Sequence, residues 1–102
     1  SHAVGAAYQG HPVGARFADV TVFSFHPVKI ITTGEGGLAL TQDDALAERL
    51  RLLRSHGVTR DAAQLERRDA PGWYYEQQAL GYNYRMTDLQ AALGSAQLER
   101  LD

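Results

Sequence analysis

The sequence has no cysteine, no excess of positive charge and no long apolar run, and each absence excludes a class of protein. Without cysteine, the 102 residues form neither a disulfide framework nor a cysteine-ligated zinc site. No segment approaches the roughly 20 apolar residues that cross a bilayer, and the first residues lack the layout of a signal peptide. The net charge of -2 disfavours a nucleic-acid binder. We therefore expect a globular, cytoplasmic chain without a nucleic-acid or membrane partner.

The four histidines are too scattered to predict a metal site. No two of them form a His-x-x-x-His pair, so the fold would have to gather ligands that the sequence keeps apart. His56 precedes Gly57 and is most simply explained as the end of a helix, where a histidine suits the helix dipole. No nucleophile elbow of the form Gly-x-Ser-x-Gly is present. We expect no metal and no serine-hydrolase chemistry.

Two short runs predict strands. Residues 19–25 are almost continuously β-branched or aromatic, which is typical of a strand buried on both faces, as in a parallel sheet. Pro27 ends this run. Residues 37–41 follow a glycine-rich stretch and predict a second strand.

Two helices are predicted in the second half of the chain. The first has leucines at helical spacing and ends at Gly57, with Thr41 or the pair Asp43-Asp44 as its N-terminal cap. The second begins at Thr87, because Thr-Asp-Leu-Gln has the spacing of a capping box. The leucines of the first helix are Leu46, Leu50 and Leu53, and the apolar stripe of the second is Leu89, Leu93, Ala96 and Leu101.

The order of these elements predicts an α/β fold that is incomplete. Residues 58–81 form a long connection, charged first and aromatic later, and a connection of that length is uncommon unless it is functional. Two short strands and two helices do not cover both faces of a parallel sheet. We expect the remaining elements to lie outside this chain or in another chain.

Lys29 is the only lysine, since the other nine basic residues are arginine. It follows the first predicted strand and is flanked by Val28, Ile30 and Ile31. Apolar surroundings disfavour the charged form of an amine, and a neutral amine is what a Schiff-base lysine requires. The alternative is a surface charge whose stem lies along apolar groups.

Three stretches could hold an anion. Ser24 ends the first predicted strand, where α/β folds collect anionic ligands, and Asn83 and Arg85 precede a predicted helix N-terminus. The glycines of 34–37 could cradle a phosphate, but the stretch lacks the Gly-Lys-Ser/Thr ending of a P-loop. The alternatives are a hydroxyl bonded to backbone, a surface arginine, and a tight connection that needs positive φ.

Several separated motifs resemble those of the DegT/DnrJ/EryC1/StrS family of sugar aminotransferases, which are fold-type I enzymes that use pyridoxal 5′-phosphate (PLP). The likeness extends in order over all 102 residues. The motifs are Ser-His-Ala-Val-Gly-Ala at 1–6, Ser-Phe-His-Pro-Val-Lys at 24–29, Gly-Glu-Gly-Gly at 34–37, Leu-Arg-Ser-His-Gly at 53–57 and Leu-Gly-Tyr-Asn-Tyr-Arg-Met-Thr-Asp-Leu-Gln-Ala-Ala-Leu-Gly at 80–94.

The resemblance implies a piece of a larger fold. Residues 1–102 would be the central fragment of the PLP-binding large domain, a three-layer α/β/α unit with a mostly parallel sheet, and the small C-terminal domain would be absent. The aspartate that holds the proton of the pyridine nitrogen in this family would lie before Ser1.

The resemblance also assigns roles to single residues. Lys29 would bind PLP as a Schiff base and carry protons, Ser24 would bind its phosphate, and His2 would lie near its ring and phenolic oxygen. Asn83 would reach across a homodimer interface to the phosphate held by the partner subunit. Substrate-binding roles fall to His26, Arg85 and Trp73, and the tyrosines that follow Trp73 would also flank the nucleotide-sugar.

The implied reaction moves an amino group from L-glutamate to C4 of a UDP-linked 4-keto-6-deoxy-hexose. Residues 73–78 and the pair His26-Pro27 are most similar to the pseudaminic acid branch of the family, and the branch that makes 4-amino-4-deoxy-L-arabinose is similar too. Lys29 disfavours the dehydratase branch, which has histidine at this position. Two alternatives remain: an oligomerising fragment without catalysis of its own, and a phosphate-binding module built on residues 34–37.

Overall fold

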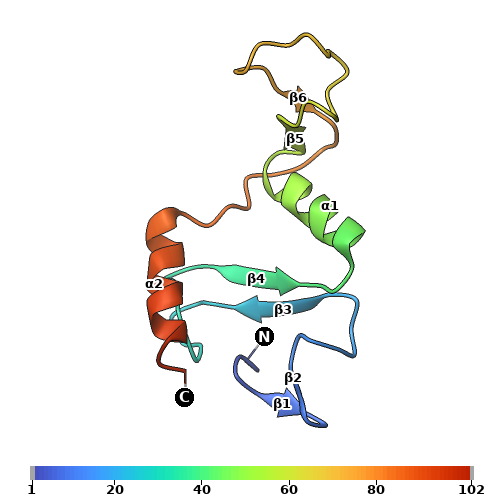
Figure 1. Cartoon of the computed structure of the whole chain (residues 1–102). Coiled ribbons are helices and arrows are strands. Elements are labelled where there is room, and N and C mark those ends of the chain that lie inside the picture. The colour runs from blue at the N-terminus through green and yellow to red at the C-terminus, as the bar shows by residue number, and fades with distance from the viewer. Residues whose placement is uncertain (1, 102) are drawn as a thin grey trace. The chain divides into compact units, whose positions relative to one another are not determined.

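The computed structural model describes residues 2–101, which form two compact units (Figure 1). The first unit comprises the described residues of 1–44 and 86–102, and the second is Ala45–Arg85. In the described part of the chain, neither helix has the length and apolar character of a membrane span.

An antiparallel pair of strands forms the centre of the first unit. β3 (Thr21–Ser24) and β4 (Gly37–Leu40) lie within the two runs predicted as strands, and Thr21 lies opposite Leu40. The prediction of a parallel sheet is therefore wrong for this pair. A parallel pair needs a crossover connection, usually a helix, whereas residues 25–36 contain only turns and bends.

β3 buries one face rather than two. Phe23 is 5% exposed, whereas its neighbour Val22 is 60% exposed. Phe23 packs with Phe25 and Ile31 in the core of this unit. Partly buried apolar side chains surround these three: Ala3, Val4, Val13, Leu40, Met86 and Leu101.

A small hairpin precedes this pair. β1 (Ala7–Tyr8) and β2 (His11–Pro12) are antiparallel, and the two residues between them, Gln9 and Gly10, both have positive φ. Positive φ at both central positions is the mark of the tight turn whose twist matches that of a hairpin.

Helix α2 (Asp88–Leu98) begins with the predicted capping box. The Thr87 side chain accepts from the Gln90 N–H at 3.3 Å, and the Gln90 side chain accepts from the Thr87 N–H at 2.9 Å. The predicted apolar stripe is divided: Leu101 packs against the core, whereas Leu89 is 86% exposed.

Helix α1 (Asp44–Arg54) is followed by the second unit's only regular strands among the described residues. β5 (Val58–Thr59) pairs antiparallel with β6 (Glu76–Gln77). α1 ends at Arg54, and the predicted stop Gly57 closes the turn that follows: its N–H donates to the Leu52 carbonyl at 3.0 Å, the bond of a Schellman-type helix end.

Candidate functional site

The connection that carries Lys29, residues 26–36 (the Lys29 loop), is closed at its base by Phe25. The Phe25 N–H donates to the Gly36 carbonyl at 2.9 Å. Its carbonyl accepts from the Thr33 N–H at 3.0 Å and from the Thr32 hydroxyl at 2.9 Å. Because Phe25 is itself buried in the core, these bonds fix both ends of the loop to the centre of the first unit.

Helix α2 holds the same loop from outside. The Thr32 N–H donates to the side-chain oxygen of Gln97 at 2.7 Å. Gly94 is the buried residue of α2, and a Cβ there would lie 2.8 Å from the methyl group of Thr33. The loop therefore has little freedom at its C-terminal end, since a hydrogen bond and close packing both act on it.

The glycines of 34–37 serve the turn and the packing of this loop. Gly34 has a φ of 81°, and its N–H donates to the Thr32 hydroxyl at 2.9 Å. A Cβ at Gly36 would overlap the Thr33 hydroxyl, and one at Gly37 would lie 3.0 Å from the Phe23 carbonyl oxygen. These glycines thus have structural roles that require no phosphate.

The Lys29 amine contacts the imidazole of His2. The Nζ atom of Lys29 lies 2.8 Å from His2 Nε2. An ammonium has donors only, so a charged Lys29 requires a neutral His2 that accepts through Nε2. The structure thus brings together two residues that are 27 positions apart in the sequence.

The apolar neighbours of Lys29 do not surround its amine as the sequence suggested. Val28 is 74% exposed and Ile30 is 56% exposed, whereas Ile31 turns into the core. Lys29 is half-buried, on a turn in which its N–H donates to the His26 carbonyl at 2.9 Å. The expectation of a lysine desolvated by its sequence neighbours is therefore wrong for Val28 and Ile30 among the described residues.

Ser24 and His26 lie at the start of the Lys29 loop. The half-buried Ser24 ends β3, and its hydroxyl accepts from the His26 N–H at 3.5 Å. His26 Nδ1 accepts from the Val28 N–H at 3.4 Å, so its Nε2 is free to carry a proton. That Nε2 lies 3.9 Å from Glu35 Oε1, a neighbour that sequence reasoning did not identify.

In the second unit, main-chain bonds join the end of α1 to the segment that carries Asn83 and Arg85. Tyr82 exchanges two bonds with the helix end: its N–H donates to Leu53 at 3.0 Å, and its carbonyl accepts from His56 at 2.9 Å. The Tyr84 N–H donates to Arg54 at 2.9 Å. The backbone at positions 82–84 is therefore fixed by carbonyls that would otherwise lack partners at a helix C-terminus.

Two glycines permit this close approach. Gly57 has a φ of 65°, and a Cβ there would overlap the Ala79 carbonyl oxygen. A Cβ at Gly81 would lie 2.7 Å from both the His56 carbonyl carbon and the Leu53 carbonyl oxygen. His56 also has a positive φ, 62°, so the left-handed turn includes a residue that the sequence did not mark for it.

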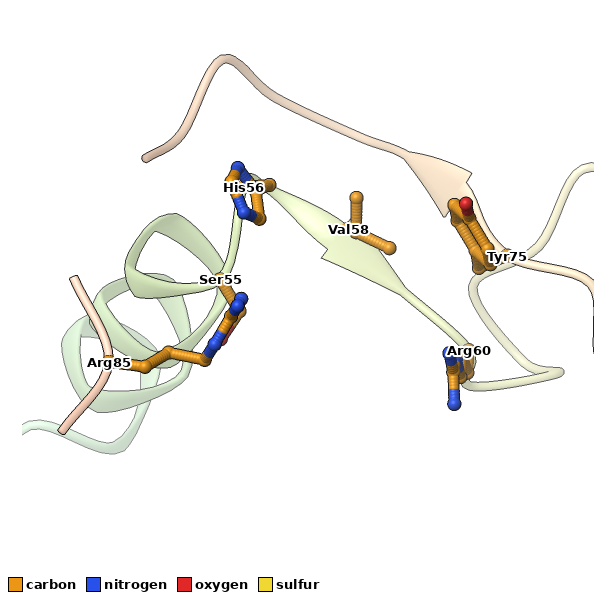
Figure 2. A pocket seen from close by; sticks show the side chains of 6 residues that line it. All are labelled: Ser55, His56, Val58, Arg60, Tyr75 and Arg85. Carbon is orange, nitrogen blue, oxygen red and sulfur yellow. The ribbon is translucent and has the colours of Figure 1, made fainter. Parts of the chain in front are cut away.

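A cavity of about 390 Å³ lies beside this helix end, and its size is in the range of small-molecule sites (Figure 2). The Arg60 guanidinium lies 5.6 Å from the centre of the Tyr75 ring. Figure 2 shows Arg85 and Arg60 at opposite ends of the cavity, with Val58 between them in this view. The lining residues are Ser55, His56, Val58, Arg60, Tyr75 and Arg85.

Residues 60–78, called the Glu76 loop below, comprise the connection from β5 to β6, β6 itself and the residue after it. Side-chain carboxylates hold this loop. The Glu76 carboxylate accepts from the N–H of Glu66 at 2.7 Å and of Arg67 at 3.1 Å. These two backbone bonds hold the pKa of Glu76 below its usual value. Partial desolvation, then the hydrogen bond to Glu76, raises the pKa of Tyr74.

The predicted site residues fall into two sets. His2, Ser24, His26 and Lys29 belong to the first unit, and of these four described residues only His2 and Lys29 are joined by their side chains. Trp73, Asn83 and Arg85 belong to the second, where Trp73 is 73% exposed and Arg85 lines the cavity. The sequence analysis missed Glu35 and Arg60.

Comparison with known proteins gives a match to the DegT/DnrJ/EryC1/StrS aminotransferase family over residues 1–102. The chain is 44% identical, over 102 residues, to the UDP-4-amino-4,6-dideoxy-N-acetyl-beta-L-altrosamine transaminase of Campylobacter jejuni. That match covers 100% of this chain and 24% of the relative, so the chain spans about a quarter of the length of the curated proteins it matches.

Two solved structures show the same fold. PseC of Helicobacter pylori, an aminotransferase involved in the biosynthesis of pseudoaminic acid, has a TM-score of 0.84 and 40% identity, and the match covers 99% of this chain and 24% of PseC. The putative sugar aminotransferase Spr1654 of Streptococcus pneumoniae, in its PMP form, has a TM-score of 0.81 and 39% identity, with 98% of this chain and 26% of Spr1654 covered.

Proposed function

This chain belongs to the DegT/DnrJ/EryC1/StrS aminotransferase family, and we propose that it is the central part of the large domain of a PLP-dependent nucleotide-sugar aminotransferase. The observation that supports this most directly is the contact of 2.8 Å between Lys29 Nζ and His2 Nε2. Lys29 lies in a loop whose two ends are fixed to the core by backbone hydrogen bonds. A fixed amine with an imidazole acceptor is what covalent catalysis by a lysine needs.

The residues of the first unit suit PLP. Lys29 offers a primary amine for its aldehyde, His2 an imidazole for its phenolic oxygen, and Ser24 a hydroxyl for its phosphate. When bound, the cofactor would supply the electron sink that the transfer needs. Lys29 would then move a proton to or from C4 of the sugar, while His2 orients Nζ.

The proposed substrates are L-glutamate and a UDP-linked 4-keto-6-deoxy-hexose of the pseudaminic acid type. The identity to the Campylobacter transaminase supports this choice. We assign His26, Trp73 and Arg85 to substrate binding, and Asn83 to the cofactor phosphate held by the partner subunit of a homodimer. A UDP-linked 4-keto-pentose, the precursor of 4-amino-4-deoxy-L-arabinose, is the alternative acceptor.

The cofactor assignment is tested on the whole gene product. Borohydride reduction after incubation with PLP should label Lys29, as located by peptide mass spectrometry. Lys29→Ala and Lys29→Arg should both lose the label and the visible absorbance of bound cofactor, because neither offers a primary amine. Lys29→Arg is the matched control for charge. Label retained at the same level in either variant would refute the assignment.

The substrate assignment is tested by supplying L-glutamate with each candidate UDP-4-keto sugar and measuring the amino sugar formed. We expect turnover with the 6-deoxy-hexose to exceed that with the pentose. A preference for the pentose would move the protein to the other branch of the family and leave the cofactor assignment intact.

A further inference from the structure

The last turn of α2 holds the Lys29 loop by a side chain. Gln97 is half-buried, and its Oε1 atom accepts from the Thr32 N–H at 2.7 Å. Thr32 has a second anchor, because its hydroxyl donates to the Phe25 carbonyl at 2.9 Å. Lys29 therefore lies between a loop base that is fixed to the core and a point that is fixed to α2.

The end of α2 also contacts the segment that carries His2, residues 2–6 (the His2 segment). Leu101, just after the helix, packs against the same core as Val4. A Cβ at Gly5 would lie 3.0 Å from a methyl group of Leu101, and Gly5 has a φ of 79°. The backbone of the His2 segment therefore lies against Leu101 at a distance that leaves no room for a side chain at Gly5.

The His2 segment and the Lys29 loop depend on common neighbours for their relative position. Within residues 2–101, no backbone hydrogen bond joins the one to the other. Their polar link is the contact of 2.8 Å between Lys29 Nζ and His2 Nε2. A long side chain keeps such a contact only where the backbones that carry both groups are held in place. Besides the apolar core, the end of α2 is what holds both backbones.

Gln97 gives this support its direction. Apolar packing at Leu101 has no preferred direction, whereas the hydrogen bond from Thr32 to Gln97 does. We propose that Gln97 is a positioning residue, which holds the Lys29 loop so that Nζ reaches both His2 Nε2 and the aldehyde of PLP. This inference rests on the proposed function and deepens it, because it assigns to α2 the geometry on which uptake of the cofactor depends.

The first measurement is the rate at which diethylpyrocarbonate modifies His2 in the whole gene product, freed of cofactor, with the site located by peptide mass spectrometry. The reagent attacks the lone pair of a neutral imidazole nitrogen, and in His2 the Nε2 lone pair is occupied by the Lys29 amine. Gln97→Met has a similar length but no strong acceptor, so it should speed the modification of His2 several-fold. Gln97→Glu keeps an oxygen acceptor at the same reach and should restore the slow rate.

Gln90→Met is the matched control on the same helix. The Gln90 side chain accepts from the Thr87 N–H at 2.9 Å, in the capping box at the other end of α2. This variant destabilises the helix but leaves the bond between Gln97 and Thr32 in place, so His2 should react at its original rate.

His11 is the internal reference for folding of the first unit. Its Nε2 atom lies 3.3 Å from an Arg16 nitrogen, in the small hairpin of β1 and β2, and its rate should be the same in every variant. A faster reaction of His11 in Gln97→Met would mean that the unit has unfolded. Gln97→Asn, whose amide is one carbon shorter, then takes the place of that variant.

The second measurement is the concentration of PLP that half-saturates Lys29, read from borohydride labelling of the same variants. Gln97→Met should raise this concentration about tenfold, the usual effect of leaving a backbone N–H without its acceptor. Gln97→Glu and Gln90→Met should leave it close to that of the unmodified protein.

Faster modification of His2 together with weaker uptake of PLP, in Gln97→Met but not in Gln90→Met, would support the proposal. An unchanged rate at His2, an unchanged uptake of PLP, or the same changes in Gln90→Met would overturn it, since Gln97 would then only stabilise the fold. If Lys29 of the unmodified protein takes up no PLP, the proposed function is refuted, and the rates at His2 alone decide whether Gln97 positions the pair.

Discussion

The Lys29 loop and the Glu76 loop are both long connections with little regular structure, but different bonds hold them. Main-chain bonds to Phe25 close the Lys29 loop, and the hydroxyl of Thr32 reinforces them. Side-chain carboxylates order the Glu76 loop, where Glu76 binds two successive N–H groups. The bonds that close the first loop therefore do not depend on the protonation state of any side chain, whereas those of the second depend on an ionised carboxylate.

This difference suits the roles proposed for the two loops. A lysine that binds a cofactor and moves a proton needs a constant backbone while charges around it change. A loop that carries Trp73 and Tyr75 toward a substrate is the kind of segment that varies in sequence and adapts its side chains. Substitutions or pH changes that destabilise one loop and leave the other unchanged would test whether the two loops are held by different bonds.

The largest effect should come from Gly57→Ala, which acts at the stem of the Glu76 loop. Its Cβ would overlap the Ala79 carbonyl oxygen, and its φ of 65° strains any residue with a side chain. We expect a local loss of about 2–4 kcal/mol, seen as faster hydrogen exchange in peptides covering 76–84. Peptides covering the Lys29 loop should be unchanged.

Gly72→Ala is the control for this change, since a Cβ at Gly72 meets nothing within 4 Å. It should leave exchange in 76–84 as it was. Equal exchange in the two variants would mean that the contact with Ala79 does not hold the stem.

A smaller effect is expected from Thr32→Val in the Lys29 loop. The Thr32 hydroxyl donates to the Phe25 carbonyl and accepts from the Gly34 N–H, both at 2.9 Å. Losing both bonds should destabilise the loop by about 1–2 kcal/mol, measured as hydrogen exchange at the Thr33 amide. Thr32→Ser keeps the hydroxyl and should stay close to the original protein; protection lost equally in both would mean that the two hydroxyl bonds are not what stabilises the loop.

The smallest effect is a pH dependence confined to the Glu76 loop. Backbone N–H groups lower the pKa of Glu76 from 4.5, so its carboxylate stabilises the loop fully above that value and loses its effect as the pH falls through the lowered pKa. Amide signals of Glu66 and Arg67 should shift on acidification, whereas that of Thr33 should not. Glu76→Gln should abolish this titration, and Glu48→Gln, on the exposed side of α1, should preserve it.

Features that depend on a few consecutive residues could be predicted from the sequence. The capping box of α2 needs only Thr87 and Gln90, and both of its bonds are present. The turn at Gly57 that closes α1 follows from one glycine after a leucine-rich helix. Family membership was predicted from motifs spread over the chain, and the match over 1–102 confirms it.

Features that depend on distant partners could not be predicted in the same way. The apolar run of 19–25 suits a strand between two layers, but it does not reveal that β4 pairs with β3 antiparallel or that Val22 stays exposed. The apolar residues next to Lys29 gave no indication that only Ile31 would enter the core. Pairing direction and burial are decided by contacts that local composition does not specify.

The candidate site shows the same limit. The contact between Lys29 and His2 joins two residues that are 27 positions apart in the chain. The resemblance named both residues, but it did not give the distance between their side chains. Arg60 was missed because no motif spacing marks it. The one signal was the length of the connection and its change from charged to aromatic residues, which indicated a functional segment but not which of its residues.

The junction between α1 and residues 82–84 has a consequence for how ligand preference could be altered. The bonds of this junction come from main-chain atoms of Tyr82, Tyr84 and the helix end, so replacing the side chains of Asn83 and Arg85 removes none of them. A library randomised at position 85, with Asn83 kept for the cofactor phosphate, would therefore sample different substrates on a constant backbone, with folding and recognition separated in a segment of four residues.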